Sequence, residues 1–311
     1  MDFYRQHKNE EHLVLATIIA TEGSTYRKTG AMLLISRGGD FEGLISGGCL
    51  EGDLLQHANL VFDSGAPAHL TYDMSAGEDL VWSLGLGCDG VIHLLLQRLE
   101  TGRGREVFEH IETAQRGRHA VLLAMVVQAD DPGVCGRMAA LDSSGAESGD
   151  PELRSELQEQ ARSWPDWRAQ PASCSVQGQA VEVLLVHIPM QTRVLVCGAG
   201  PDALPLVRVL DELGWDVIVA DHRPAFARPG RFPAKCTVLQ SRPEKLSESV
   251  DMKSIDGAVI MSHHLENDAE YLRQVTMAAP RSIAALGPRA RMGRLTVMAD
   301  GRDRLVFGPA G

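Results

Sequence analysis

The chain has 311 residues, 44% of them hydrophobic, and a formal net charge of -11. This length exceeds that of a typical single domain, so we expect two domains, each with its own core. The 30 Lys and Arg residues are scattered along the chain, which argues against a nucleic-acid-binding surface. No apolar run reaches the roughly 18 residues that a membrane span requires, and residues 1–12 are polar. We therefore expect a soluble, cytoplasmic protein without a nucleic-acid or membrane partner.

Six cysteines, at positions 49, 88, 135, 174, 197 and 236, include no C-x-x-C pair. This spacing argues against a zinc ribbon and against a thioredoxin-type redox pair, and it is typical of reduced cytoplasmic thiols. For four of them we expect small, buried apolar side chains: Cys135, Cys174, Cys197 and Cys236. The other two stand beside glycines and are candidates for chemistry.

Residues 1–190 mix strands and helices without strict alternation. Short apolar or β-branched runs bounded by Gly, Ser or Asp predict strands at 13–21, 31–36, 68–73, 91–99, 120–128 and 179–188. Helical spacing of apolar residues predicts helices within 50–64, 105–117 and 151–164. The Gly, Ser and Asp cluster at 142–150 predicts an exposed loop, and no internal repeat is evident. We expect residues 1–190 to form a mixed α/β domain that ends at a junction near 189–192.

Regular alternation begins after that junction. Strands are predicted at 193–197, 216–221, 257–262 and 282–286, with helical segments after the first and third of them. Because parallel strands cannot be joined by a tight turn, this order implies right-handed crossovers and a parallel sheet. Residues 191–311 therefore predict a Rossmann-like, doubly wound domain.

A glycine-rich turn follows the first of these strands. Gly198, Gly200 and Ala203 fill the pattern G-x-G-x-x-[G/A], and Asp221 ends the second strand, where a ribose-binding carboxylate is expected. The context favours a dinucleotide such as NAD, NADP or FAD. The glycines could also serve packing alone, or the domain could bind a different nucleotide or a pterin. Arg223 could accept an extra phosphate or cap the sheet, and the sequence leaves both open.

Two further segments should lie beyond the carboxyl ends of the strands, where open α/β sheets bind ligands. Adjacent histidines point in different directions, so a metal site that uses both His263 and His264 is not expected. His263 is our candidate for ligand contact, with a loop-anchoring hydrogen bond as the alternative. Arg289 follows the last strand, where its guanidinium could clamp a phosphate or simply begin a solvated helix.

The segment GLISGGCLEGDLL, residues 43–55, places a thiol where an apolar run gives way to a helix. Gly47 and Gly48 can adopt positive φ and direct successive N–H groups at an anion. Cys49 would lie near the first helical turn, where the macrodipole lowers a thiol pKa. Such a thiolate can bind a soft metal or carry a sulfane sulfur.

Two neighbouring loops extend this candidate site. The segment EGSTYRKTGAM supplies donors for a phosphate or a pterin edge, and GLGCDG holds a second accessible thiol among glycines. The candidate residues in these loops are Gly23, Ser24, Arg27, Gly87 and Cys88. The alternative is that the glycines only build tight turns and that both thiols are buried.

Taken in order, the segments GSTYRKTGAMLLI, GLISGGCLEGDLL and GLGCDGVIHLLL, followed by GAGPDA, DHRP, MSHH and ALGPRAR, make a specific combination. The chain resembles the XdhC/CoxI family of molybdoenzyme accessory factors over essentially its whole length. The resemblance implies a chaperone-like maturation protein that binds the molybdenum cofactor, molybdopterin. It would keep the cofactor available for exchange of an oxo for a sulfido ligand by a cysteine desulfurase, and deliver it to a xanthine-dehydrogenase-type molybdenum hydroxylase.

On this pattern Cys49 and Cys88 match the cysteine loops of the family, and we expect them to contact molybdenum or sulfur. We also expect a homodimer. No side chain stands out as a general base, so a carrier is expected and not an enzyme. Two other functions stay open, namely an NAD(P)-dependent oxidoreductase, which the glycine motif and Asp221 would support, and a nucleotide-sensing interaction module without catalysis.

Overall fold

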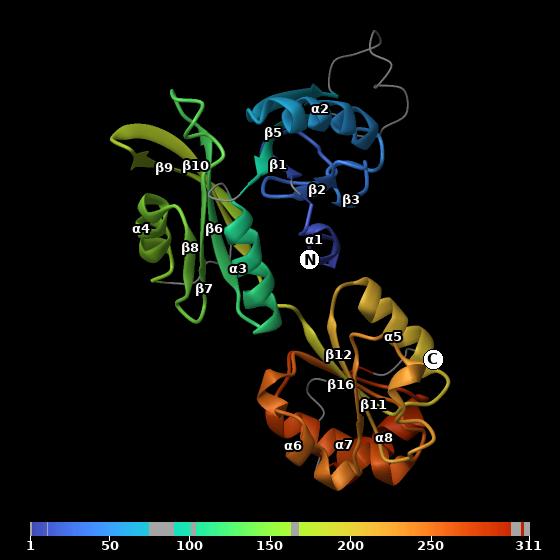
Figure 1. Ribbon diagram of the computed structural model, residues 1–311. Helices are drawn as coiled ribbons and strands as arrows, with labels where there is room; N and C mark the ends of the chain where they lie inside the picture. The colour runs from blue at the N-terminus through green and yellow to red at the C-terminus, as the bar shows by residue number, and fades with distance from the viewer. Residues whose placement is uncertain are drawn as a thin grey trace. The chain divides into compact units, whose positions relative to one another are not determined.

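The computed structural model describes residues 2–10, 12–74, 90–100, 104–162, 168–299 and 306–307. The chain divides into two compact units, Met1–Met190 and Gln191–Gly311, and Figure 1 shows their helices and strands. The first unit is built on antiparallel strands and the second on parallel strands. The fold is therefore α/β, with a mixed first unit and a Rossmann-like second unit, as the sequence predicts.

The first unit contains two five-stranded antiparallel sheets. The first sheet has the order β3-β2-β1-β5-β4 and consists of β1 (Leu13–Glu22), β2 (Met32–Ser36), β3 (Phe41–Gly43), β4 (Ala68–Asp73) and β5 (Val91–Leu99). The second has the order β8-β7-β6-β10-β9 and consists of β6 (Val121–Gln128), β7 (Met138–Asp142), β8 (Glu147–Gly149), β9 (Ala169–Val176) and β10 (Gln179–Ile188).

The two halves of this unit share one connectivity. A helix precedes each first strand, namely α1 (Asp2–His7) and α3 (Arg105–Arg116). Another helix joins each third strand to the fourth, namely α2 (Glu51–Ser64) and α4 (Pro151–Gln160). Both halves are thus helix, three strands, helix and two strands, with corresponding strand orders. The sequence shows no repeat, because the halves share the order and direction of their elements and not their residues.

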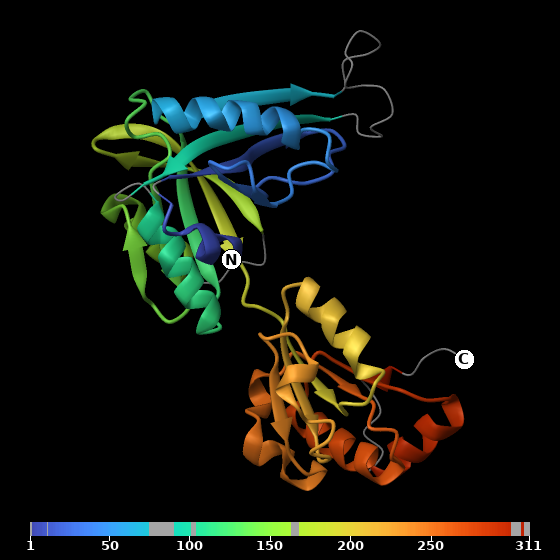
Figure 2. The same ribbon diagram turned by 45° about the vertical axis from the view of Figure 1, so that its right-hand side comes forward.

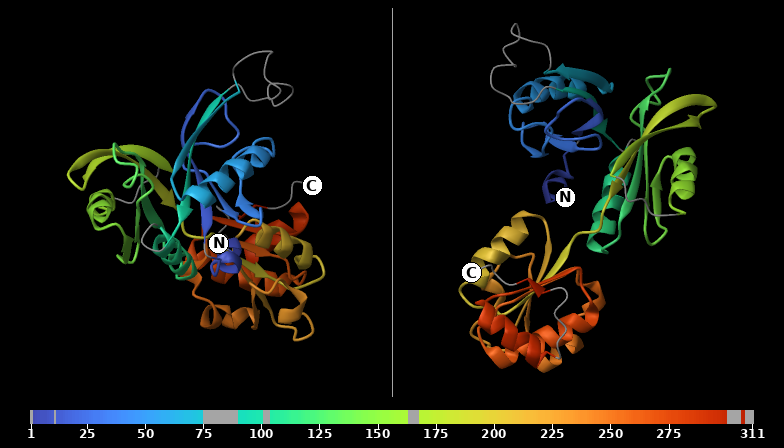
Figure 3. Two further views of the ribbon diagram at one scale, coloured as in Figure 1. Left: turned by 45° about the horizontal axis from the view of Figure 1, so that its top comes forward. Right: turned by 180° about the vertical axis from the view of Figure 1, so that it is seen from behind.

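Strand alternation explains how these sheets pack. Along β1, Leu13 and Leu15 enter a core shared by both sheets, whereas Val14 and Ala16 face α2 on the other side. In β6, Leu123 belongs to the shared core and its neighbours face α4. Figures 1 and 3 show α2 and α4 each lying beside its own sheet. The central strands of each sheet are therefore buried on both faces, whereas the edge strand β3 is exposed.

The helices and strands predicted in this unit are confirmed, with ends that differ by a few residues. The prediction of a loop throughout 142–150 is wrong in part, because Glu147–Gly149 forms β8 and pairs with β7. Asp142 closes the intervening turn, where its carboxylate accepts hydrogen bonds from the N–H groups of Ser144 and Ala146. An Asx-type turn thus carries a polar segment from strand to strand.

The second unit is a six-stranded parallel sheet in the order β13-β12-β11-β14-β15-β16. Its strands are β11 (Arg193–Cys197), β12 (Asp216–Asp221), β13 (Thr237–Gln240), β14 (Gly257–Ile260), β15 (Ser282–Ala285) and β16 (Val306–Phe307). Numbered from β11, this is the order 3-2-1-4-5-6 of dinucleotide-binding sheets. The strand order reverses between β11 and β14, which is where such sheets bind ligands.

Helices cover both faces of this sheet. On one face α5 (Ala203–Glu212) packs against Val194 and Val196 of β11. The other face is covered by α6 (Leu246–Ser249), α7 (Leu265–Ala278) and α8 (Arg289–Met298), and Figure 2 shows α5 and these helices on opposite sides of the sheet. The connection from β12 to β13 contains only the short 3-10 turn Pro229–Arg231, so the alternation of strand and helix is less regular than expected. Among the described helices, none has both the length and the apolar character needed to cross a bilayer.

Tyr271 on α7 carries a buried hydroxyl group. Its side chain is fully buried, and its hydroxyl has no hydrogen-bond partner among the described residues. Burial raises the pKa of Tyr271 above its ordinary value. We expect Tyr271→Phe to leave the second unit as stable as before or more stable, because burying an unsatisfied polar group costs about 1–3 kcal/mol. Scanning calorimetry of the full chain would measure this.

Tyr4→Phe is the matched control, since Tyr4 is also buried but its hydroxyl donates to the Arg105 carbonyl at 3.3 Å. Here we expect a loss of about 1 kcal/mol in the free energy of unfolding of the first unit. A similar loss for Tyr271→Phe would contradict the prediction and would indicate a partner for that hydroxyl in solution.

Candidate functional site

One end of the first sheet gathers the loops that carry the sequence motifs. The register pairs Thr17 with Met32, Leu33 with Gly43, and Glu22 with Val91. The loop 23–31 after β1, the loop 44–50 after β3 and the start of β5 therefore lie at the same edge. Gly90 packs directly on this edge, because a Cβ there would lie 2.5 Å from the carbonyl oxygen of Glu22.

The loop 44–50 is organised around the buried hydroxyl of Ser46. Ser46 Oγ donates to the Glu51 carboxylate at 2.5 Å, and the Ser46 N–H donates to its other oxygen at 3.0 Å. The same hydroxyl oxygen accepts from the N–H groups of Gly48, Cys49 and Leu50 at 3.1–3.3 Å. This closure holds the loop in one conformation at the start of α2.

The geometry of the glycines differs from the expectation. Only Gly48 has a positive φ, of 106°, and the N–H groups of Gly48 and Cys49 point at Ser46 instead of an external anion. Cys49 is half-buried and precedes the N-cap residue Leu50. A Cβ at either Gly47 or Gly48 would meet no atom of the described residues within 4 Å, and both glycines are exposed among these residues.

The second half of the unit has a counterpart of equal length to the loop 23–31, namely residues 129–137, but its other two connections are much shorter. Only Asp150 separates β8 from α4, and only residues 177–178 separate β9 from β10. In the first half, the corresponding connections are residues 44–50 and residues 74–90. Two halves of one connectivity thus differ at the connections that carry the glycine and cysteine motifs. This difference indicates that the motif loops are elaborations which the fold itself does not require.

Other candidate residues of this region are placed as follows. Gly23 has a φ of 66°, Ser24 is exposed and Arg27 is half-exposed in the loop 23–31. The carbonyl of Arg27 accepts a hydrogen bond from Thr25 Oγ1 at 2.8 Å, which shapes the loop. Gly87 and Cys88 lie outside the described residues. Within the described ranges, no three His, Cys, Asp or Glu side chains gather closely enough to hold a metal ion.

The remaining cysteines do not share one environment. Cys135 and Cys197 are buried as expected, whereas Cys174 and Cys236 are only half-buried. Burial raises the pKa of all four thiols, in the case of Cys236 to about 11. These thiols are therefore protonated at neutral pH and poorly suited to metal binding.

In the second unit, the glycine motif packs against the end of β14. Gly198 has a φ of 117°, and a Cβ there would lie 2.6 Å from the carbonyl oxygen of Met261. A Cβ at Gly200 would lie 2.6 Å from Asp202 Oδ1. The first glycine is thus required by close approach of two backbone segments, and the second leaves room for an acidic side chain at the start of α5.

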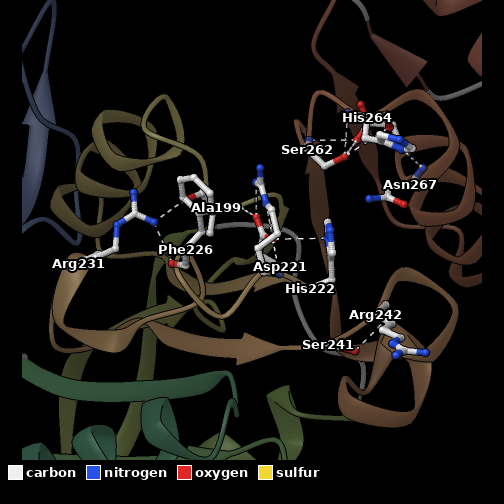
Figure 4. Close-up of polar contacts among 12 residues, drawn as sticks. Ala199, Asp221, His222, Phe226, Arg231, Ser241, Arg242, Ser262, His264 and Asn267 are labelled. Carbon is white, nitrogen blue, oxygen red and sulfur yellow. Dashed lines mark hydrogen bonds and ion pairs between the residues drawn. The ribbon is translucent and has the colours of Figure 1, made fainter.

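Asp221 ends β12 with its side chain 1% exposed. It accepts hydrogen bonds from Ala199 N–H at 2.7 Å and from Arg223 N–H, Nε and Nη2 at 2.7–3.0 Å. Burial acts to raise the pKa of Asp221, but these hydrogen bonds outweigh it and hold that pKa below its usual value. Figure 4 shows Asp221 beside His222, with Arg231 bonded to the carbonyls of Ala199 and Phe226 nearby.

The two histidines after β14, His263 and His264, make different contacts. His263 has a φ of 64°, a conformation uncommon outside glycine, and its Nε2 lies 2.6 Å from Asp202 Oδ2. His264 caps α7, since its Nδ1 accepts from the Asn267 N–H at 3.4 Å (Figure 4). His263 thus joins the glycine loop to the β14 loop across the point where the strand order reverses.

A second hydroxyl–carboxylate pair lies at this edge. Ser262 Oγ donates to the buried Asp268 at 2.5 Å, and Arg291 Nη2 donates to the other Asp268 oxygen at 2.7 Å. Arg289, the candidate from sequence, is exposed at the first position of α8. Sequence analysis missed Ser46, Glu51 and Asp268, although a serine followed by an acidic residue in the first helical turn is a recognisable signal of a capped helix start.

A groove of about 690 Å³ lies between the two sheets of the first unit. It is lined by corresponding strands of the two halves, namely β1, β4 and β5 and their counterparts β6, β9 and β10. His69 crosses it, with Nε2 2.7 Å from the Val127 carbonyl oxygen. None of its lining residues belongs to the Cys49 loop, but Thr29 of the loop 23–31 lines it, so the groove reaches one loop of the motif-bearing edge.

Comparison with known proteins extends over both units. The model of the XdhC and CoxI family matches residues 6–73, and that of the XdhC Rossmann domain matches residues 194–303. A probable xanthine dehydrogenase subunit of Bacillus subtilis is 29% identical over 295 residues, which cover 93% of this chain and 83% of that protein. The crystal structure of a xanthine dehydrogenase from Bacillus halodurans is similar with a TM-score of 0.77 and 26% identity, covering 100% of this chain and 88% of the other.

The hydrogen bonds of the Ser46 hydroxyl predict the effect of removing this hydroxyl. We expect Ser46→Ala to speed amide hydrogen exchange in residues 46–50 and to lower stability by about 1–2 kcal/mol, since three N–H groups lose their acceptor. Exchange measured by mass spectrometry, together with calorimetry, would check both effects. Ser24→Ala, an exposed serine at the same edge, should change neither. Unchanged exchange in Ser46→Ala would show that the hydroxyl does not organise the loop.

The Glu51 carboxylate also predicts a pH dependence. Burial acts to raise the pKa of Glu51, but hydrogen bonds from Ser46 hold it below the ordinary value of 4.5. Because the pKa is lower in the folded state, the carboxylate stabilises the fold fully above pH 4.5 and loses this effect as the pH falls through the lower, folded value. The stability difference between wild type and Glu51→Gln, measured by denaturant titration, should therefore be constant above that pH and shrink below it. A difference that grows on acidification would contradict this assignment.

Proposed function

Because the chain belongs to the XdhC and CoxI family, we propose that it is an accessory factor for a xanthine-dehydrogenase-type molybdenum enzyme. The observation that carries the proposal is the motif-bearing edge of the first sheet. Two of its connections, residues 44–50 and 74–90, are longer in the half that contains Cys49 than in the other half, where one and two residues make the same connections. The relatives that match both units carry the name of xanthine dehydrogenase or of one of its subunits.

The proposed cargo is the molybdenum cofactor, bound at this edge and passed on to the client enzyme. Cys49 provides a soft sulfur, and Gly47 and Gly48 beside it are exposed among the described residues. The N–H groups of the loop are engaged with Ser46, so a phosphate would rely on the basic side chains of Arg27 and Lys28 in the neighbouring loop. These residues fit a ligand that must leave again, because the described part of the chain holds no preformed cage of metal ligands.

Two finer parts of the proposal follow from this role. A cysteine desulfurase would be a second partner, which meets the carrier while it exposes the cofactor. The second unit would bind a dinucleotide at the edge formed by Gly198, Asp221 and His263, which has the strand order of dinucleotide-binding sheets. That binding would make delivery responsive to a nucleotide without requiring catalysis.

Cofactor binding predicts a loss on replacement of the thiol. We expect Cys49→Ser, purified as the full chain from a host that makes molybdopterin, to hold at least tenfold less molybdenum, because a hydroxyl is a hard and undissociated ligand. Metal analysis and fluorescence of the oxidised pterin would measure occupancy. Cys174→Ser is the matched control, since this thiol is half-buried like Cys49 but lies on the edge strand β9. Full occupancy in Cys49→Ser would overturn the assignment.

A reconstitution experiment separates a carrier from an oxidoreductase. A carrier should raise the activity of a separately produced, cofactor-deficient molybdenum hydroxylase, saturably with protein and less after Cys49→Ser. It should show no steady NAD(P)H turnover with carbonyl or purine substrates. Substrate-dependent NAD(P)H oxidation that is abolished by His263→Ala and unaffected by Cys49→Ser would overturn the proposal in favour of an oxidoreductase.

A further inference from the structure

In dinucleotide-binding sheets an acidic residue accepts a hydrogen bond from the ribose. In this chain the corresponding carboxylate already accepts hydrogen bonds from other residues of the protein. Asp221 stands at the end of β12, where such an acidic residue normally accepts a hydrogen bond from a ribose hydroxyl. Here its two oxygens accept four hydrogen bonds, one from Ala199 and three from Arg223, and the side chain is 1% exposed. A carboxylate has about four lone-pair sites, so none is left for a ribose diol.

The group that remains reachable is Arg223. Its Nε and Nη2 donate to Asp221, while its guanidinium lies 4.1 Å from the centre of the Phe226 ring. This support from both sides fixes the plane of the guanidinium. The side chain is nevertheless 36% exposed, so a ligand can approach it. An arginine held in this way is suited to bind a phosphate, because its donors need no further ordering.

The acidic side chains at this edge of the sheet are already engaged within the unit. Three acidic side chains border it, and each is paired within the unit: Asp202 with His263, Asp221 with Arg223, and Asp268 with Arg291. Next to Arg223, His222 has a buried Nδ1 without a hydrogen bond among the described residues, 3.5 Å from Asp221 Oδ1. Arg242 is exposed directly after β13, the strand that neighbours β12. The chain as a whole has a net charge of -11, so exposed basic side chains beside paired carboxylates distinguish this edge of the sheet.

We propose that the end of β12 is a subsite for a phosphorylated ribose, so that this unit binds 2′-phosphorylated dinucleotides in preference to those with a free diol. The proposal rests on the dinucleotide binding proposed above and names its specificity. Arg223 supplies the primary contact, and Asp221 acts as a positioning residue that holds the guanidinium. The diol of an unphosphorylated ligand would have to displace Arg223 from Asp221 to find an acceptor.

Titration calorimetry of the full chain at one ionic strength tests this with NADP+ and NAD+. We expect NADP+ to bind roughly tenfold or more tightly than NAD+, which is the range of one added charge-assisted contact. The same difference should separate adenosine 2′,5′-bisphosphate from 5′-AMP, which differ only in that phosphate. Arg223→Ala should lower NADP+ affinity at least tenfold and leave NAD+ affinity unchanged or raised, because it frees the Asp221 oxygens for a ribose diol.

Arg228→Ala is the matched control, since this arginine is exposed in the same segment, and it should alter neither affinity. Arg223→Lys keeps the charge and should retain part of the preference, which guards against loss of fold in the alanine variant. Equal affinities, or a preference for NAD+, would overturn the subsite while leaving dinucleotide binding in place. Binding of neither nucleotide would overturn both, and the carrier role would then rest on the molybdenum measurements alone.

Discussion

The central strands of the described sheets bury side chains on both faces, and this constraint decides where ligands can be reached. In the first unit the inner faces share one core while α2 and α4 cover the outer faces. In the second unit α5 lies on one face and α6, α7 and α8 on the other. Polar chemistry is thus confined to the ends of strands and to the groove between corresponding strands. Both candidate sites lie at strand ends for this reason.

The two sites also close their loops in the same way. In each, a serine that follows a strand donates its hydroxyl to a buried carboxylate in the next helix, Ser46 to Glu51 and Ser262 to Asp268. A buried carboxylate is tolerated only when its oxygens are hydrogen-bonded, so this bond fixes the loop as well as the acidic side chain. Cys49 and His263 are each presented by a loop that is organised before any ligand arrives. The two candidate residues are thereby held in loops whose conformation is fixed by hydrogen bonds, which favours a preorganised site.

The two halves of the first unit share one connectivity, so comparing them shows which loops the fold does not require. Two halves that share helix, three strands, helix and two strands could use equally short connections. Only the first half has long connections between its third strand and the next helix and between its last two strands. These connections carry GLISGGCLEGDLL and GLGCDG. The second half keeps the scaffold and contributes the opposite wall of the groove. One half of the duplication is therefore structural, and the other carries the candidate chemistry.

The sequence by itself determined the local elements, the parallel second unit and the edges at which candidate residues would lie. It could do so because apolar periodicity and glycine spacing are local properties. Only the tertiary structure decided which partners those residues have. Asp221 was expected to face a ribose, but its oxygens accept hydrogen bonds from Arg223, two residues along the chain, and from Ala199, whose position depends on how the glycine loop meets the end of β12. The N–H groups beside Cys49 likewise turn to Ser46, and the repeat of the first unit exists in strand order alone. Topology and contacts such as that of Ala199 with Asp221 are set by packing between distant segments, whereas the contacts of Arg223 and Ser46 are local and depend on the loop conformation that this packing fixes.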